Sequence, residues 1–136
     1  MGQIRDLMTG NPTTCEPSAT IVDVAKVMAT EDVGPVPIVE GERVVGIVTD
    51  RDIVVRVVAE GKDVTSTTAG EIASSDLITL TPDSDLQEAE RLMSQNQVRR
   101  LPVVDGDRIV GIVAQADIAR AAEEERTGEV VQQISR

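Results

Sequence analysis

The sequence predicts an α+β fold in which two β-α-β-β-α repeats, related by a pseudo-twofold axis, pack into one module. The two halves come into register when the chain is shifted by about 65 residues. Strand-like apolar runs alternate with amphipathic helix patterns in each half. A repeat of about sixty residues is too small to bury its sheet and helices alone. We expect repeat 1 at 8–60, a polar linker at 61–69, repeat 2 at 70–126 and a tail at 127–136.

Local patterns justify the elements of each repeat in order. Thr20 and Asp23 have the spacing of a helix capping box, and Ile21, Val24, Ala25 and Met28 then follow at helical spacing. Glycine-containing turns between apolar runs predict a hairpin in each half. In the first half we expect a lead-in turn at 4–8, a strand at 13–16, a helix from 20 onward, a hairpin at 36–48 and a helix at 50–61. In the second half we expect a turn at 70–73, a strand at 77–80, a helix at 85–95, a hairpin over 105–106 and a helix at 115–126.

Composition excludes several classes of function. The chain has 136 residues, 40% hydrophobic, with no Phe, Trp or Tyr, so a bound base would have to lie between aliphatic side chains and backbone. A net charge of −11 disfavours nucleic-acid and anionic-membrane partners. The chain lacks His, and neither catalytic residues nor a metal site is expected. A single Cys15, no recognisable signal peptide and no long apolar run lead us to expect a cytoplasmic protein.

The junction after the first hairpin has the strongest functional pattern. The apolar run Val44 to Val48 ends at Thr49, and Asp52 follows three residues later at a predicted helix start. Free backbone N–H groups at such a junction can hold phosphate, and an Asp can accept two hydrogen bonds from the cis-diol of a ribose. Thr-x-x-Asp is equally a capping box, in which the two residues only satisfy each other's backbone groups.

The helix expected from Asp50 to Glu60 is apolar around most of its circumference. It contains Ile53 and the valines at 54, 55, 57 and 58. Such a helix must be covered on both sides. Its own sheet would cover one side and a second copy of the chain the other; the alternative is a fully internal helix in a monomer.

The sequence resembles a tandem pair of CBS domains, the Bateman module, over nearly its whole length. The resemblance rests on Gly46-Ile-Val-Thr-Asp-Arg-Asp52, on Gly111-Ile-Val-Ala-Gln-Ala-Asp117 and on the preceding Pro37-Ile-Val and Pro102-Val-Val strands. Within the family it is most similar to stand-alone actinobacterial proteins related to hypoxic response protein. Such modules are regulatory, bind adenosine-containing ligands between their repeats, and commonly form dimers.

The resemblance implies one main ligand site and a second, weak one. Thr49 and Asp52 would hold the ribose, with the base near Thr14 and the segment Gly34, Pro35 and Val36. Arg99 and Arg100 would reach the phosphate, unless they are simply solvated; Arg51 would add charge or point to solvent. The second site would comprise Thr79, Ala114 and Asp117, and lacks the Thr hydroxyl.

The sequence thus predicts a regulatory sensor that binds AMP, ADP, ATP or S-adenosylmethionine and acts in trans on an unknown effector protein. We expect a homodimer that requires no cofactor. The alternative is a ligand-free dimeric scaffold. We expect no enzymatic activity, because no pairing of nucleophile and base is visible.

Overall fold

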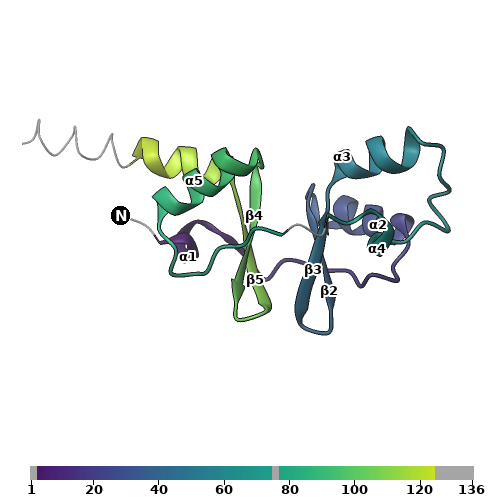
Figure 1. Ribbon diagram of the computed structural model, residues 1–136, viewed down its shortest axis with the longest axis horizontal. Helices are drawn as coiled ribbons and strands as arrows, with labels where there is room; N and C mark the ends of the chain where they lie inside the picture. The colour runs from purple at the N-terminus through teal and green to yellow at the C-terminus, as the bar shows by residue number, and fades with distance from the viewer. Residues whose placement is uncertain (1–2, 75–76, 125–136) are drawn as a thin grey trace, which may run out of the picture. The chain divides into compact units, whose positions relative to one another are not determined.

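Figure 1 shows the computed structural model, which describes residues 3–74 and 77–124. The described chain divides into two compact units. Unit 1 comprises residues 3–10, 78–105 and 110–124, and unit 2 comprises 11–74, 77 and 106–109. The units therefore differ from the sequence repeats at their lead-in segments. The segment before repeat 1 packs in the unit of repeat 2, and the turn that opens repeat 2 packs in the unit of repeat 1.

Unit 2 is an antiparallel hairpin with helices on one side (Figure 1). Its elements are α2 (Ile21–Glu31), β2 (Val36–Glu40), β3 (Arg43–Val48), α3 (Asp50–Ile53), a π-helical stretch η1 (Val54–Val58) and α4 (Ala69–Ile72). Val36 pairs with Val48 and Glu40 with Arg43, so the predicted hairpin is confirmed. Its turn passes through Gly41 at φ 67°, a conformation that glycine adopts without strain. The core gathers eight buried side chains: Ile21, Val24, Val36, Ile38, Val48, Val57, Ala69 and Ile72.

Unit 1 repeats this plan. It contains α1 (Ile4–Leu7), β1 (Thr9–Gly10), α5 (Leu86–Asn96), β4 (Arg100–Asp105) and β5 (Arg108–Ala114), of which residues 108–109 belong to unit 2. Residues 115–124 are helical. β5 pairs with β4 and, antiparallel, with β1. The buried core consists of Ile4, Leu80, Ala89, Met93, Leu101, Val103, Val113 and Ile118.

The helix caps agree with the sequence. The backbone N–H of Asp23 donates to Thr20 Oγ1 over 3.2 Å, which confirms the predicted capping box of α2. The N–H of Glu88 donates to Asp85 Oδ1 over 2.8 Å at the start of α5. Each bond satisfies a backbone donor that the first helical turn cannot pair internally.

Several expected elements differ from the structure. The segments 13–16 and 77–80 are single parallel bridges, Cys15 to Ile38 and Leu80 to Val103, rather than strands. The adjacent strands carry Pro37 and Pro102, which have no N–H to extend the ladder. Ala25 is exposed instead of facing the core. The helix expected at 50–61 becomes π-helical at Val54 and ends at Val58. The short strand β1 was not expected. Positions 125–136, including the predicted tail, lie outside the described residues.

The repeated Gly-Ile-Val motif is explained by the exchanged lead-in segments. A Cβ on Gly46 would lie 2.7 Å from Ala73 Cβ and 2.9 Å from the Ser74 carbonyl oxygen, which follow α4. A Cβ on Gly111 would lie 2.9 Å from Met8 Cγ and 3.0 Å from the carbonyl oxygen of Thr9 in β1. Each glycine therefore lets a lead-in segment approach the backbone of a hairpin strand closely.

Candidate functional site

The junction between β3 and α3 is a complete capping box. The backbone N–H of Asp52 donates to Thr49 Oγ1 over 3.1 Å, and the N–H of Thr49 donates to Asp52 Oδ2 over 2.9 Å. Both residues are half-buried. The capping interpretation is therefore correct, but it uses only one carboxylate oxygen. Asp52 Oδ1 accepts no hydrogen bond from any residue in 3–74 or 77–124.

Backbone contacts bring the other predicted base-lining residues of unit 2 toward this junction. The N–H of Asp50 donates to the Gly34 carbonyl oxygen over 3.2 Å, so the segment before β2 lies against the start of α3. Val36 pairs with Val48 and is fully buried, while Gly34 and Pro35 are half-buried. The bridge of Cys15 to β2 places the half-buried Thr14 beside the same strand.

The nearby cysteine has a raised pKa. Burial, and secondly the negative charge of Asp23, raise the pKa of the Cys15 thiol above its usual value. The thiolate is therefore disfavoured at neutral pH, and this is the environment of a structural cysteine rather than of a reactive one.

Unit 1 contains a second junction of the same form but with different chemistry. The N–H of Ala114 donates to Asp117 Oδ2 over 3.2 Å, and the N–H of Gln115 donates to the Arg99 carbonyl over 2.7 Å. Ala114 offers no hydroxyl in return. Arg120 Nη2 donates to Asp117 Oδ1 over 3.0 Å, whereas Val55 occupies the equivalent place in repeat 1. Both oxygens of Asp117 are therefore occupied. Thr79, which was predicted to belong to the same second site as Asp117, is exposed.

The predicted cationic residues are exposed. Arg99 directly precedes β4 and Arg100 is its first residue; both belong to unit 1, and so to a different unit from Asp52. Arg51 lies in the first turn of α3. Within the described part of the chain, none of the three guanidinium groups has an ion-pair or hydrogen-bond partner. They remain available to an anion.

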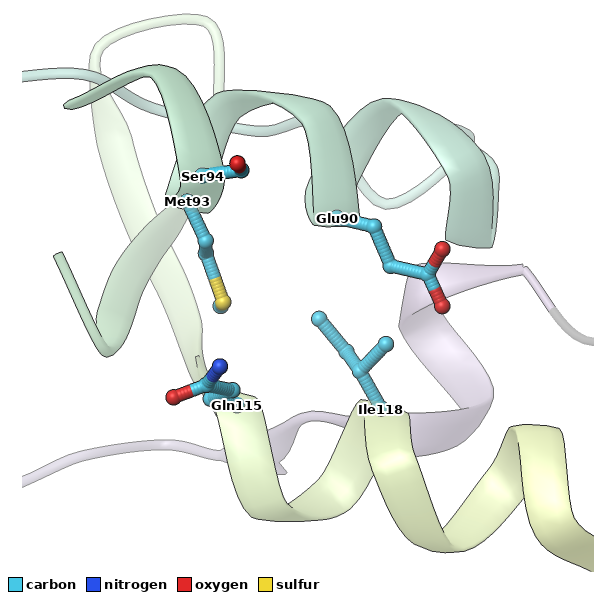
Figure 2. Close-up of a pocket in the computed structure, with 5 residues that line it drawn as sticks. All are labelled: Glu90, Met93, Ser94, Gln115 and Ile118. Atoms are coloured by element: carbon cyan, nitrogen blue, oxygen red, sulfur yellow. The ribbon is translucent and has the colours of Figure 1, made fainter. Parts of the chain in front are cut away.

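One cavity in unit 1 was not expected. It has a volume of about 190 Å³ and lies between α5 and the helix at 115–124 (Figure 2). Met93 and Ile118 are its buried apolar residues, and Glu90, Ser94 and Gln115 are exposed around it. Sequence analysis identified no signal for it, and it includes none of the predicted ligand-site residues.

Two features are absent from residues 3–74 and 77–124. These residues contain no group of three or more His, Cys, Asp or Glu side chains placed to hold a metal ion. Within the same ranges, no helix is long and apolar enough to cross a membrane.

Comparison with known proteins decides the family. The family model described as "CBS domain" matches twice, at residues 4–59 and 69–124. The chain belongs to the CBS-domain family. This confirms the tandem repeat, and with it the identification made from the doubled Gly-Ile-Val motif. CBS domains are regulatory modules, and the match indicates no catalytic family.

Similar proteins share most of the chain. The CBS domain-containing protein YhcV of Bacillus subtilis is 41% identical over 119 residues, covering 88% of this chain and 84% of YhcV. Hypoxic response protein 1 of Mycobacterium tuberculosis is 39% identical over 121 residues, covering 88% and 85%. The resemblance to the hypoxic response type is thereby confirmed.

Solved structures confirm the fold. A crystal structure of Hypoxic Response Protein I with two coordinated zinc ions matches with a TM-score of 0.79 at 39% identity, over 87% of this chain and 97% of that one. The CBS domain pair of protein MJ0100, in complex with 5′-methylthioadenosine and S-adenosyl-L-methionine, matches with a TM-score of 0.82 at 28% identity, over 92% and 98%. A hexameric CBS-CP12 protein from cyanobacteria matches with a TM-score of 0.78 at 31% identity, over 88% and 70%.

Proposed function

We propose that this chain is a homodimeric sensor that binds an adenosine compound at the Thr49–Asp52 junction and regulates an effector protein in trans. Candidate ligands are AMP, ADP, ATP and S-adenosylmethionine. The observation that carries the proposal is the difference between the two junctions. Among the described residues, Asp52 has one carboxylate oxygen without a hydrogen-bond partner and a Thr at the cap, whereas Asp117 has both oxygens occupied and an Ala in place of the Thr.

The junction has the chemistry that a ribose requires. Asp52 Oδ2 is held by the backbone of Thr49, so the orientation of the carboxylate is fixed before any ligand arrives. The free Oδ1 can accept a hydrogen bond from a ribose hydroxyl, and ionised acceptors make stronger hydrogen bonds than neutral ones. Thr49 Oγ1 accepts from the Asp52 N–H, which leaves its own proton to donate.

The rest of the proposed site follows from the resemblance. Thr14, Gly34, Pro35 and Val36 would contact the base, and aliphatic and backbone atoms must do so because the chain has no aromatic residue. The MJ0100 domain pair, which holds two adenosine compounds, supports this ligand class.

Phosphate binding would depend on a local positive charge. The net charge of −11 opposes any anion, so Arg51, Arg99 and Arg100 are the proposed counter-charges. Their exposed, unpaired guanidinium groups in the described chain are compatible with this role. The part assigned to Arg99 and Arg100 rests on the sequence resemblance.

Calorimetric titration with a matched pair of variants tests the proposal. AMP, ATP and S-adenosylmethionine are each titrated into wild type, Asp52→Ala and Asp117→Ala. A charge-assisted hydrogen bond contributes about 1.5–3 kcal/mol, so Asp52→Ala should weaken the preferred ligand roughly ten- to hundredfold. Asp117→Ala removes the equivalent carboxylate of repeat 2 and should bind like wild type.

The same titration decides between the sensor and the ligand-free scaffold. The scaffold alternative is favoured by the exposed valines of η1, which suit an interaction module whether or not a ligand binds. No heat of binding from any of the three compounds to wild type would favour the scaffold. Binding that is lost in Asp117→Ala and kept in Asp52→Ala would show that the wrong junction has been chosen.

A further inference from the structure

One side chain connects the candidate ligand junction to the segment that contains α4. Arg56 lies in η1, four residues after Asp52. Its Nη1 atom donates a hydrogen bond over 2.5 Å to the carbonyl oxygen of Ile72, the last residue of α4. A carbonyl at the end of a helix has no partner within that helix. Arg56 therefore caps α4 and ties it to the helix that begins at the Thr49–Asp52 junction.

The same segment is also bonded to the hairpin. We call residues 69–74 the exchanged segment. The N–H of Ser74 donates to the Ile47 carbonyl oxygen over 3.0 Å, and the N–H of Ile47 donates to the Ser74 carbonyl oxygen over 3.3 Å. Farther along the chain, Leu77 still belongs to unit 2 and Ile78 to unit 1. The exchanged segment is therefore the part of unit 2 from which the chain continues into the second repeat.

Arg56 has a second acceptor within reach in the Asp52 carboxylate. Side chains four residues apart on a helix are neighbours, and an Asp and an Arg at this spacing attract each other. Asp52 Oδ1 accepts no hydrogen bond from residues 3–74 or 77–124, and the guanidinium that could fill it is bonded to Ile72 instead. The two contacts are alternatives for one side chain. The structure shows the one that leaves Asp52 open to a ligand.

Repeat 2 shows the closed alternative. There Arg120 donates to Asp117 Oδ1 over 3.0 Å, so a cation from the next helical turn occupies the carboxylate. Sixty-five residues after Arg56 the chain has Ala121, whose side chain offers no donor to a lead-in segment. The link between junction and exchanged segment is thus confined to repeat 1, which contains the proposed ligand site.

We propose that Arg56 is a positioning residue that couples the ligand junction to the exchanged segment by bonding to either Ile72 or Asp52. A ligand hydroxyl on Asp52 Oδ1 competes with Arg56 for that oxygen and so favours the bond to Ile72, which secures the segment. Release of the segment frees Arg56 to bond Asp52 and close the junction. Such coupling is reciprocal, because each site biases the same two states. This inference rests on the proposed function and names how that site is regulated.

Hydrogen exchange of the Ser74 amide, followed by NMR without nucleotide, tests the two alternatives. Asp52→Asn removes the charge that attracts Arg56 but keeps an oxygen for the Thr49 N–H, so exchange should slow about two- to fivefold, the effect of one exposed ion pair. Arg56→Met keeps the aliphatic stem and removes the donor, so exchange should be about two- to fivefold faster. Asp50→Asn is the matched control, because it removes a charge from the same helical turn, and it should leave the rate nearly unchanged.

A double-mutant cycle separates this effect from any change in the cap of α3. In the Arg56→Met background, Asp52→Asn should no longer slow the exchange of the Ser74 amide. Equal slowing with and without Arg56 would overturn the proposal, and so would the absence of slowing by Asp52→Asn alone.

The same amide reports the effect of a ligand. AMP, ATP and S-adenosylmethionine are added separately, and each compound that binds in calorimetry should slow Ser74 exchange in wild type but not in Arg56→Met. Binding without slowing in wild type would overturn the coupling. If none of the three compounds binds, the proposed function fails, while the cycle without nucleotide still decides whether Arg56 alternates between its two acceptors.

Discussion

Adding one methyl group at Gly46 should destabilise the protein, because the exchanged segment after α4 lies where the methyl group would go. In Gly46→Ala the new Cβ would lie 2.7 Å from Ala73 Cβ and 2.9 Å from the Ser74 carbonyl oxygen. Ordinary contacts begin at 3.4 Å, so the segment must retreat by about half an ångström or more. Neither atom can rotate away, since one is fixed to the backbone and the other belongs to it.

The magnitude follows from two opposing terms. Overpacking of this kind costs about 1–3 kcal/mol. Replacing a glycine by alanine returns about 0.4–1 kcal/mol, because the unfolded chain loses freedom. We expect a net loss of about 1–2 kcal/mol, and a Tm lowered by roughly 3–10 °C for a chain of this size.

Gly10→Ala is the matched control. Gly10 also lies in an exchanged lead-in segment, but its Cβ would meet only the Val110 carbonyl oxygen, at 4.0 Å. Its stability should equal or slightly exceed that of wild type. The assay is thermal unfolding by far-UV circular dichroism, because the chain has no Trp or Tyr for fluorescence. A Gly46→Ala protein as stable as wild type would refute the claim that this glycine is required by the exchange.

Three further predictions concern the caps, the second junction and the cysteine. Thr20→Ala removes the acceptor of the Asp23 N–H and should cost about 1 kcal/mol in urea unfolding, while Thr20→Ser should cost less. Arg120→Ala combined with Ala114→Thr frees one Asp117 oxygen and restores the hydroxyl, so calorimetry should show a second adenosine site; an unchanged stoichiometry would mean that these two residues do not silence it. Because its pKa is raised, the Cys15 thiol should react with a disulfide reagent at pH 8.5 more slowly in the native than in the urea-unfolded chain. The associated stability is present below the unfolded thiol pKa and is lost as pH rises through the folded pKa; equal reaction rates would contradict this.

Local signals made much of the fold predictable. Gly41 and Gly106 both adopt positive φ in the hairpin turns where the sequence places them, and Thr20 caps its helix through the expected partner. These features depend on a few consecutive residues, and a similar local pattern occurs in both repeats. The exchange of the lead-in segments was not predictable in this way, because it depends on contacts between residues far apart, such as Gly46 and Ala73.

The same distinction between local patterns and long-range contacts applies to the candidate site. The bonds between Thr49 and Asp52 could be predicted from their spacing of three residues. The same spacing separates Asp117 from Arg120, so the ion pair that occupies the second carboxylate was a readable signal that sequence analysis missed. The exposure of Val54, Val55 and Val58 agrees with the expectation that the sheet of the same chain covers only one side of this helix, and it contradicts the alternative of a fully internal helix. The π-helical form of Val54–Val58 had no signal in the sequence.

The most direct test of the central claim is the amount of adenine that each chain retains when unbound ligand is removed. The chain has no Trp, Tyr or Phe, so it absorbs very little at 260 nm, and the adenine retained after rapid gel filtration can be counted from the spectrum. For the ligand preferred in calorimetry, the account predicts about one adenine per chain in wild type and in Asp117→Ala, and almost none in Asp52→Ala. Equal adenine content in wild type and Asp52→Ala, whether two, one or none per chain, would contradict it.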